Sequence, residues 1–395
     1  MPLGPLSWGR PRAARKVSAL LLASGLLSAC TPATGSAPVS TGPAASSDRL
    51  LPACPPPPAK RGIKDAAAAN ALVATTNLAH WQAADIGASV RLSDERIAWV
   101  FGDTLRAPTL SPRIVANSML ITSGTCVTQL IPAGGGPVLP DPEPGTVLWP
   151  MSAVTLRLGR DEDELILLCS RIHRGTGAYG FTFVGTSAAV FDIGRLGVPH
   201  LSRIEAITPD DESLTQVNWG AASVVHGGWL YVYGTRLTGA KAVFGREMYV
   251  ARAPTTDPGR RSGWRFWDGR RWRADVSRAA PILGSAGGVS QTLSVDVVGG
   301  TFLAVSKRDG DLGDFVYTWA SSGPTGPWRA RRAVPAPAGF DTGALQYAPL
   351  AHPEVPLDSG RLLVSISRNT TDLAALVRNP RLGRPRFVEV SAPQP

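Results

Sequence analysis

Short runs of apolar and β-branched residues recur along most of the chain after residue 80. Gly, Pro, Asp and Asn separate these runs, and that punctuation is typical of strands joined by hairpins. The pattern predicts strands over 88–92, 97–101, 117–122, 152–158, 165–170, 188–191, 221–225, 229–233, 247–251, 293–298, 301–306, 315–320, 361–366 and 387–390. The Ala-rich segment 65–73 is the one place where we expect a short helix, with Asp65 as its N-cap, and a loop is the alternative.

The predicted strands fall into a loose repeat. Two stretches share one order: a strand, a Gly-Gly turn (Gly227-Gly228 or Gly299-Gly300), a second strand, a loop and a third strand. Repeated units of this kind cover 82–125, 146–195, 214–275, 288–332 and 344–391. A ring of such sheets buries each sheet against its neighbours. We therefore expect an all-β domain over 60–395, a five-bladed β-propeller with four-stranded antiparallel blades, and a β-sandwich with irregular insertions is the alternative.

The first 60 residues read differently from the rest. A basic start is followed by an apolar stretch over 17–27 and by Leu27-Ser28-Ala29-Cys30, so residues 1–29 are predicted to be a secretory signal peptide. The stretch Leu27-Ser28-Ala29-Cys30 resembles the bacterial lipobox, and this resemblance predicts lipidation of Cys30 and attachment to the membrane through that lipid. An ordinary signal peptide is the alternative. Residues 30–59, rich in Pro, Ser and Thr, are expected to be an extended tether. The mature chain would then be extracytoplasmic, anchored to the outer face of the cell membrane.

The charge distribution and the cysteine content indicate which binding partners and which disulfides to expect. The formal net charge is +10, but the arginines are scattered, whereas nucleic-acid binding favours a concentrated basic stripe. We therefore expect no nucleic-acid partner. Beyond Cys30, the residues Cys54, Cys126 and Cys169 allow one disulfide whose pairing the sequence leaves open. No pattern of ligand spacing indicates a metal site, and we expect no cofactor.

The stretch Trp99-Val100-Phe101-Gly102-Asp103-Thr104 puts a carboxylate directly after a strongly apolar run. Gly-Asp is an ordinary turn signal, in which the aspartate caps its own backbone. The alternative is a catalytic acid at the rim of a sheet.

These residues, together with Ala84-Asp85-Ile86-Gly87 upstream and Asn117-Ser118 downstream, resemble the N-terminal signature of the DUF4185 family. Later stretches are similar to that family too, among them Trp219-Gly220 and the Gly326-Pro327-Trp328 turn. The resemblance covers about residues 75–370. It implies a five-bladed propeller and, for part of the family, endo-D-arabinanase activity on the D-arabinofuranose chains of actinobacterial arabinogalactan and lipoarabinomannan.

The resemblance implies that Asp85 and Asp103 form the carboxyl pair that glycoside hydrolysis requires. The apolar run before Asp103 favours it as the acid, with Asp85 as the base of an inverting reaction, although the sequence does not fix these roles. The residues expected to line a sugar-binding funnel are Asn117, Trp149, Trp219, Gln291, Tyr347 and His352. We expect a cell-envelope polysaccharide as the partner. A non-catalytic glycan-binding propeller and a protein-interaction scaffold are the alternative functions.

Overall fold

The computed structural model describes residues 47–58, 62–176 and 180–393. Within these ranges no helix combines the length and the apolar character needed to cross a membrane. The predicted signal peptide and Cys30 lie outside the described residues.

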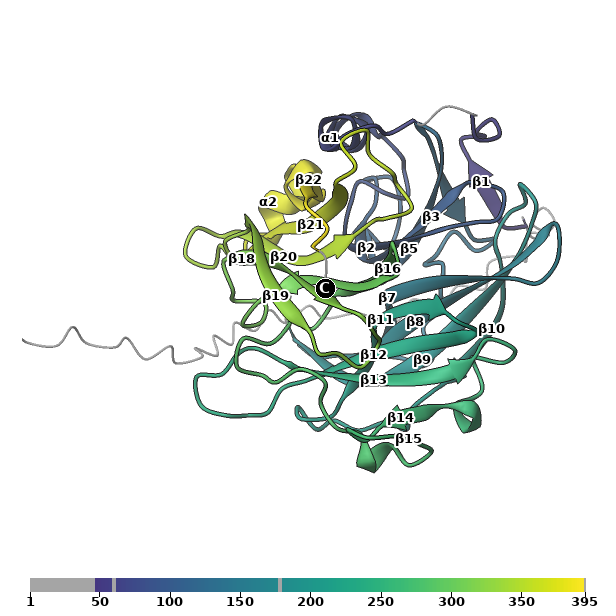
Figure 1. Cartoon of the computed structure of the whole chain (residues 1–395). Helices are drawn as coiled ribbons and strands as arrows, with labels where there is room; N and C mark the ends of the chain where they lie inside the picture. The colour runs from purple at the N-terminus through teal and green to yellow at the C-terminus, as the bar shows by residue number, and fades with distance from the viewer. Residues whose placement is uncertain (1–46, 59–61, 177–179, 394–395) are drawn as a thin grey trace, which may run out of the picture. The chain divides into compact units, whose positions relative to one another are not determined.

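Five antiparallel sheets follow one another along the chain (Figure 1). The first contains β1 (Arg49–Leu51), β2 (Ala83–Arg91), β3 (Ile97–Leu105), β4 (Ile114–Val115), β5 (Ser118–Ser123) and β6 (Cys126–Ile131). The second contains β7 (Thr146–Arg157), β8 (Glu162–Arg174), β9 (Phe181–Gly194) and β10 (His200–Ala206). The third contains β11 (Asn218–His226), β12 (Trp229–Arg236), β13 (Glu247–Pro254), β14 (Arg265–Trp267) and β15 (Trp272–Arg273). The fourth contains β16 (Ser294–Val298), β17 (Thr301–Lys307), β18 (Phe315–Ser321) and β19 (Arg329–Pro335), and the fifth β20 (Ala344–Ala351), β21 (Leu362–Thr370) and β22 (Arg386–Val390).

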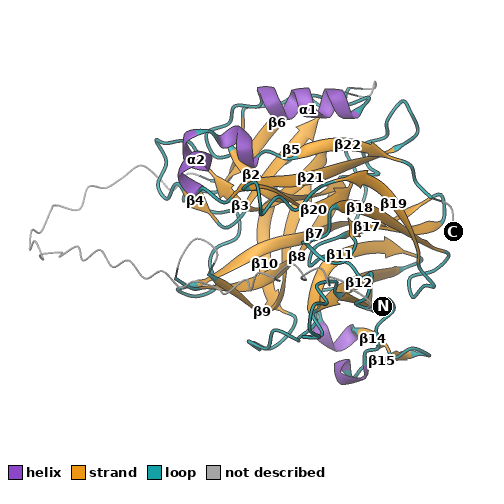
Figure 2. Cartoon of the chain, turned by 90° about the vertical axis from the view of Figure 1, so that its left-hand side faces the viewer, coloured by secondary structure: helices purple, strands orange, loops and turns teal. Residues whose placement is uncertain are grey.

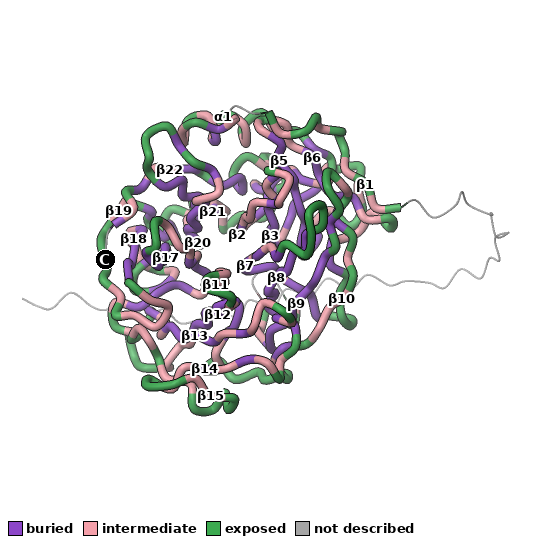
Figure 3. Tube along the Cα trace, turned by 45° about the vertical axis from the view of Figure 1, so that its right-hand side comes forward, coloured by how far each residue is buried: buried purple, intermediate pink, exposed green. Residues whose placement is uncertain are grey.

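The sheets are the blades of a closed ring. Each inner strand contacts the inner strand of the next blade, in the order β2, β7, β11, β16 and β20, and β20 contacts β2 again. Figure 3 shows strands of this set toward the middle of the view, with β1, β10, β15 and β19 at the periphery. The predicted five-bladed β-propeller is confirmed, and the β-sandwich alternative is excluded.

The hydrophobic core is divided among the faces between neighbouring blades. Val100 and Met119 of blade one share a cluster with Leu165 and Phe191 of blade two. Similar clusters lie between the other neighbouring pairs, including the last and the first blade. Because each blade buries both faces, its strands need apolar side chains on both sides, and this explains the short continuous apolar runs of the sequence.

The prediction of four strands in every blade is wrong for three of the five. Only blades two and four have four strands, while blade five has three. Helix α1 (Ala66–Thr75) lies beside β22 at the outer edge of blade five (Figure 2). Asn70 clamps that edge: its Nδ2 donates to the carbonyl of Phe387 at 2.8 Å, and its Oδ1 accepts from the N–H of Phe387 at 2.9 Å. The predicted helix is confirmed, and Asp65 caps it through a hydrogen bond from the N–H of Ala68 at 2.7 Å.

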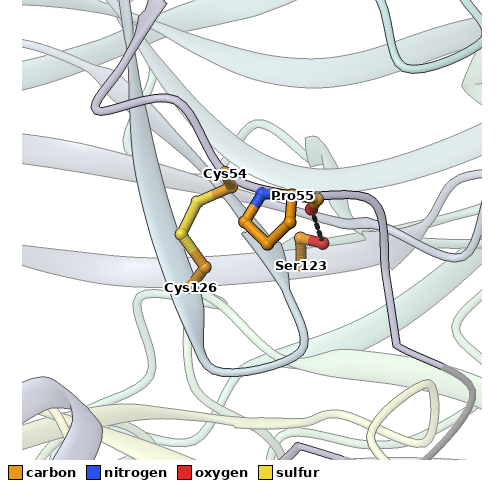
Figure 4. Close-up of a disulfide and its surroundings, with 4 residues drawn as sticks. All are labelled: Cys54, Pro55, Ser123 and Cys126. Atoms are coloured by element: carbon orange, nitrogen blue, oxygen red, sulfur yellow. Dashed lines mark hydrogen bonds between the residues drawn. A yellow bond between two sulfur atoms is a disulfide. The ribbon is translucent and has the colours of Figure 1, made fainter.

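The end of the expected tether belongs to blade one. Strand β1 pairs with β6, and Cys54 forms a disulfide with Cys126 at the start of β6 (Figure 4). Ser123 adds a hydrogen bond from its hydroxyl to the carbonyl of Pro55 at 2.5 Å. An extended tether that reaches residue 59 is therefore wrong for residues 49–54, since backbone pairing and a covalent bond hold them to the sheet. Cys169, the remaining cysteine of the described residues, is free and buried.

Candidate active site

A cavity of about 480 Å³ opens among the inner strands of the ring. Five of the residues predicted from the sequence contribute to its lining: Asp85, Asp103, Trp149, Gln291 and Tyr347. They come from blades one, two, four and five, so the site exists only once the ring has closed.

Asp85 enters the cavity through an irregular stretch of β2. The register between β2 and β3 shifts on both sides of Ile86, and Ile86 and Gly87 have φ angles of 66° and 77°. A β-branched residue with positive φ is a strained outlier that costs on the order of 1–3 kcal/mol, and such strain concentrates at functional sites. The N–H of Ile86 donates to Ser367 Oγ of blade five at 3.0 Å, which holds the bulge in place.

Gly102 leaves room for the Asp85 carboxyl group. A Cβ atom added at Gly102 would lie 2.6 Å from Asp85 Oδ1 and 3.4 Å from Ile86 Cγ1. The glycine of the Gly102-Asp103-Thr104 motif is thus required by the close approach of a carboxylate from the neighbouring strand. It does not form a turn, because β3 continues to Leu105.

The surroundings of Asp85 favour its protonated form. Its Oδ2 accepts a hydrogen bond from the hydroxyl of Tyr347 at 2.8 Å. Loss of water around the carboxyl group, and then the negative charge of Asp103, raise the pKa of Asp85 to about 7; the Tyr347 hydrogen bond and the positive charge of Arg174 oppose this shift. A carboxyl group with this pKa can donate a proton at neutral pH.

Asp103, in contrast, accepts hydrogen bonds from two neighbouring side chains. Trp149 Nε1 donates to its Oδ1 at 3.0 Å, and Arg174 donates to both oxygens, with Nη1 3.1 Å from Oδ2. The side chain of Asp103 is 32% exposed, so it remains accessible from the cavity. The two aspartates on neighbouring strands therefore differ in their surroundings: Asp103 is paired with Arg174, whereas Asp85 accepts a hydrogen bond from Tyr347.

Three predicted site residues lie elsewhere, and for them the prediction is wrong. Asn117 is buried, and its Nδ2 donates hydrogen bonds to the carbonyls of Leu139 and Leu148 at 3.1 and 3.0 Å. Trp219 is a core residue that packs on Phe266 with ring centroids 5.0 Å apart. His352 is fully buried; its Nε2 and Ser365 Oγ are 2.8 Å apart. Each has a structural role in packing or in anchoring the backbone.

The structure adds polar and aromatic residues to the site that the sequence did not indicate. Arg174 is the last residue of β8, and Phe181 is the first residue of β9. The rings of Phe181 and Trp149 pack edge to face, with their centroids 4.9 Å apart. Asp311 also lines the cavity. A pattern of paired carboxyl groups gives no signal for an arginine at the last position of β8.

Gln291 and Asp311 form the blade-four side of the cavity. Gln291 Oε1 accepts from Arg246 at 3.1 Å, which leaves its amide nitrogen for other partners. Burial lowers the pKa of Arg246, and the charge of Asp311 opposes this change. The buried cation is thus balanced by a carboxylate at the cavity surface.

The architecture defines the class of protein: a five-bladed β-propeller with a carboxylate-lined cavity among its inner strands. One similar solved structure is a Bacteroides ovatus protein named, provisionally, as a hydrolase (TM-score 0.63, 17% identity, 82% of this chain and 88% of that one covered). Another is a family 43 arabinoxylan arabinofuranohydrolase from Bacillus subtilis, solved with cellotetraose (TM-score 0.51, 12% identity, 80% and 66% covered). At these identities the likeness establishes the fold alone. No curated protein matches the chain.

The chain belongs to the DUF5005 family, a domain of unknown function, whose model matches residues 73–392. The matching family is therefore DUF5005 and not DUF4185, the family that the sequence stretches around Asp85 and Asp103 led us to expect. The matched region begins within α1 and includes all five inner strands, and therefore the whole cavity.

Proposed function

We propose that this protein is a glycoside hydrolase in which Asp85 is the general acid and Asp103 is the carboxylate that activates water. The observation that carries the proposal is the contrast between these two carboxyl groups in one cavity. Asp85 has a pKa raised to about 7, while Arg174 and Trp149 donate to Asp103. Two carboxyl groups with different surroundings in one cavity are the arrangement that this chemistry uses.

The roles are the reverse of those expected from the sequence. The apolar run before Asp103 predicted burial of that residue, but its side chain stays partly exposed and ion-paired. In the proposed reaction, Asp85 protonates the glycosidic oxygen as its bond to the anomeric carbon breaks. The oxygen of water bonds to that carbon, and the proton of water passes to Asp103. The expected outcome is inversion at the anomeric carbon.

The proposed substrate is a cell-envelope polysaccharide that contains D-arabinofuranose, of the arabinogalactan or lipoarabinomannan type, cleaved by endo action. Support comes from the resemblance of the Asp85 and Asp103 stretches to DUF4185. The Cys54–Cys126 disulfide supports an extracytoplasmic location, because such bonds persist in oxidising compartments. The lipid anchor at Cys30 is proposed from the lipobox alone.

A non-catalytic glycan-binding propeller is the second candidate. The aromatic pair Trp149 and Phe181 in the cavity lining favours it, since aromatic faces bind sugar rings without any proton transfer.

The test is incubation of the purified protein with a panel of envelope polysaccharides, with released oligosaccharides as the measurement. Asp85→Asn and Asp103→Asn should each lower the rate by at least a hundredfold while glycan binding persists. Asp192→Asn, an exposed aspartate on β9 outside the cavity, is the matched control and should keep the full rate. Binding without release of products by the wild type would favour the second candidate.

A further inference from the structure

The blade-four side of the cavity places a hydrogen-bond donor beside an acceptor. Gln291 and Asp311 both line the cavity, and the backbone nitrogen of Gln291 lies 3.5 Å from Asp311 Oδ2. Arg246 Nη2 donates to Gln291 Oε1 at 3.1 Å, so the orientation of the amide is fixed and its Nε2 keeps two N–H donors for another partner. Within the described residues, no group accepts a hydrogen bond from that Nε2.

Tightly packed loops hold this pair in place. A Cβ atom added at Gly245, in the loop before β13, would lie 2.2 Å from the carbonyl oxygen of Ser285 in the loop before β16. One added at Gly310, in the loop after β17, would lie 2.1 Å from the carbonyl oxygen of Phe244. Glycine permits this close approach of backbone to backbone. The pair is therefore preorganised, which lowers the entropic cost of binding a ligand.

The charges behind the pair compensate one another. Arg246 and Lys307 are the cations; burial lowers the pKa of Lys307 to about 8, so it stays protonated at neutral pH. The charge of Asp311 acts on both cations, and that of Asp314 acts on Lys307. Lys307 is fully buried, with its Nζ 3.4 Å from the backbone carbonyl oxygen of Asp311. Two positive and two negative groups leave no excess charge to attract an ionic ligand.

A neutral sugar fits the chemistry of this pair. Every sugar hydroxyl both donates and accepts hydrogen bonds, so two neighbouring hydroxyl groups can accept from the amide and donate to the carboxylate together. We infer that Gln291 and Asp311 form a second sugar subsite, which binds two neighbouring hydroxyl groups of a neutral glycan residue. This residue belongs to the same chain that Asp85 and Asp103 cleave, and that step alone rests on the proposed function.

Calorimetric binding to the Asp85→Asn variant tests the subsite without cleavage. The probes are tetrasaccharides: two neutral ones, of D-arabinofuranose and of glucose (cellotetraose), a cationic one of glucosamine and an anionic one of galacturonic acid. The measurement is made at about pH 6, where both charged probes are ionised. The better of the two neutral probes should bind roughly tenfold more tightly than either charged probe, because an ionic group brought into the cavity without a counter-charge loses its hydration.

Substitutions in the same background identify the two side chains. Gln291→Glu can keep the contact with Arg246 but removes the N–H donors, and Asp311→Asn puts a donor in place of an acceptor oxygen. Each should weaken binding of the neutral probe roughly tenfold, because a sugar hydroxyl loses its partner inside the cavity. Asp314→Asn is the matched control: it removes the other carboxylate that acts on Lys307, does not line the cavity and should leave the affinity unchanged.

Failure of both neutral probes to bind, tighter binding of a charged probe, or neutral binding that survives both substitutions would overturn the inference. An equal loss in Asp314→Asn would assign the effect to the charge of Lys307 and would also overturn it. Thermal unfolding of each variant shows that it is folded, and if Asp311→Asn is not, Gln291→Glu decides alone. Failure of the proposed function reads differently: the wild type would release no product from any glycan, while binding that depends on Gln291 and Asp311 would remain.

Discussion

The hydroxyl of Tyr347, on the inner strand of blade five, donates a 2.8 Å hydrogen bond to Oδ2 of Asp85 on the inner strand of blade one. The two residues are 262 positions apart and meet across the seam where the ring closes. The carboxyl pair itself lies within blade one, and closure of the propeller adds the Tyr347 hydroxyl to it.

Tyr347→Phe should shift the alkaline limb of the pH–rate profile to higher pH. The hydrogen bond from Tyr347 stabilises ionised Asp85 and lowers its pKa, so its loss raises that pKa further. The general acid then stays protonated to a higher pH, although the rate falls because the carboxyl group is less well positioned. The measurement is kcat against pH between 5 and 9, and Tyr231→Phe, away from the cavity, should leave the limb unmoved.

Asp85→Asn should lower the activity and yet stabilise the fold above neutral pH. The folded state raises the pKa of this carboxyl from 3.8 to about 7, so it binds the proton more tightly than the unfolded chain does. The stability of the wild type therefore falls as pH rises from about 4 to 7. Thermal unfolding at pH 8 should show the variant more stable by about 4 kcal/mol, since one pKa unit corresponds to about 1.4 kcal/mol, and the difference should vanish near pH 4. A variant that is less stable than the wild type at pH 8 would contradict the raised pKa.

Gly102→Ala should reduce kcat by at least tenfold with a small change in stability. The added methyl group would meet Asp85 Oδ1 at 2.6 Å and displace the carboxyl group, and even a small misplacement of a reacting group is costly. Gly159→Ala is the control, because nothing lies within 4 Å of its Cβ position. A rate for Gly102→Ala equal to that of the control would show that the position of Asp85 does not limit catalysis.

Arg174→Gln should lower kcat by roughly a hundredfold, the loss found when a preorganised charge contact is removed. The guanidinium donates to both oxygens of Asp103 and lies over the Trp149 ring at 5.3 Å, so its loss frees the carboxylate and the indole together. The matched control is the exposed Arg157→Gln, whose side chain bonds to neighbouring loop carbonyls. Unchanged kcat in Arg174→Gln would leave the ion pair with a structural role only.

Removal of the Cys54–Cys126 disulfide should destabilise the protein. The bond closes a loop of 72 residues, and loss of such a constraint costs about 2–4 kcal/mol by the chain-entropy account. Cys54→Ser with Cys126→Ser, measured by denaturant unfolding, tests this. Cys169→Ser is the control, since it alters a buried thiol without opening a loop. If the double variant were as stable as the wild type, the pairing of β1 with β6, and not the disulfide, would hold this segment to the sheet.

Much of the fold could be read from the sequence because strand formation leaves a local signal. The runs at 97–101, 229–233 and 301–306 are strands, and the five predicted units match the five blades. The strands that the sequence pattern did not predict include β10 and β19, in which no residue is fully buried. An outer strand with one solvated face carries no continuous apolar run, so its pattern resembles that of a loop.

The sequence by itself predicted the blade repeat and a helix capped by Asp65, and its family resemblance pointed to Asp85 and Asp103 as the proposed carboxyl pair. Only the tertiary structure decided which side chains face the cavity. Asn117, Trp219 and His352 have the chemistry of site residues but are buried in packing, while Arg174 reaches Asp103 from another blade. The physical reason is that bulges such as that at Ile86 change which face a side chain occupies, and protonation depends on neighbours that ring closure brings together.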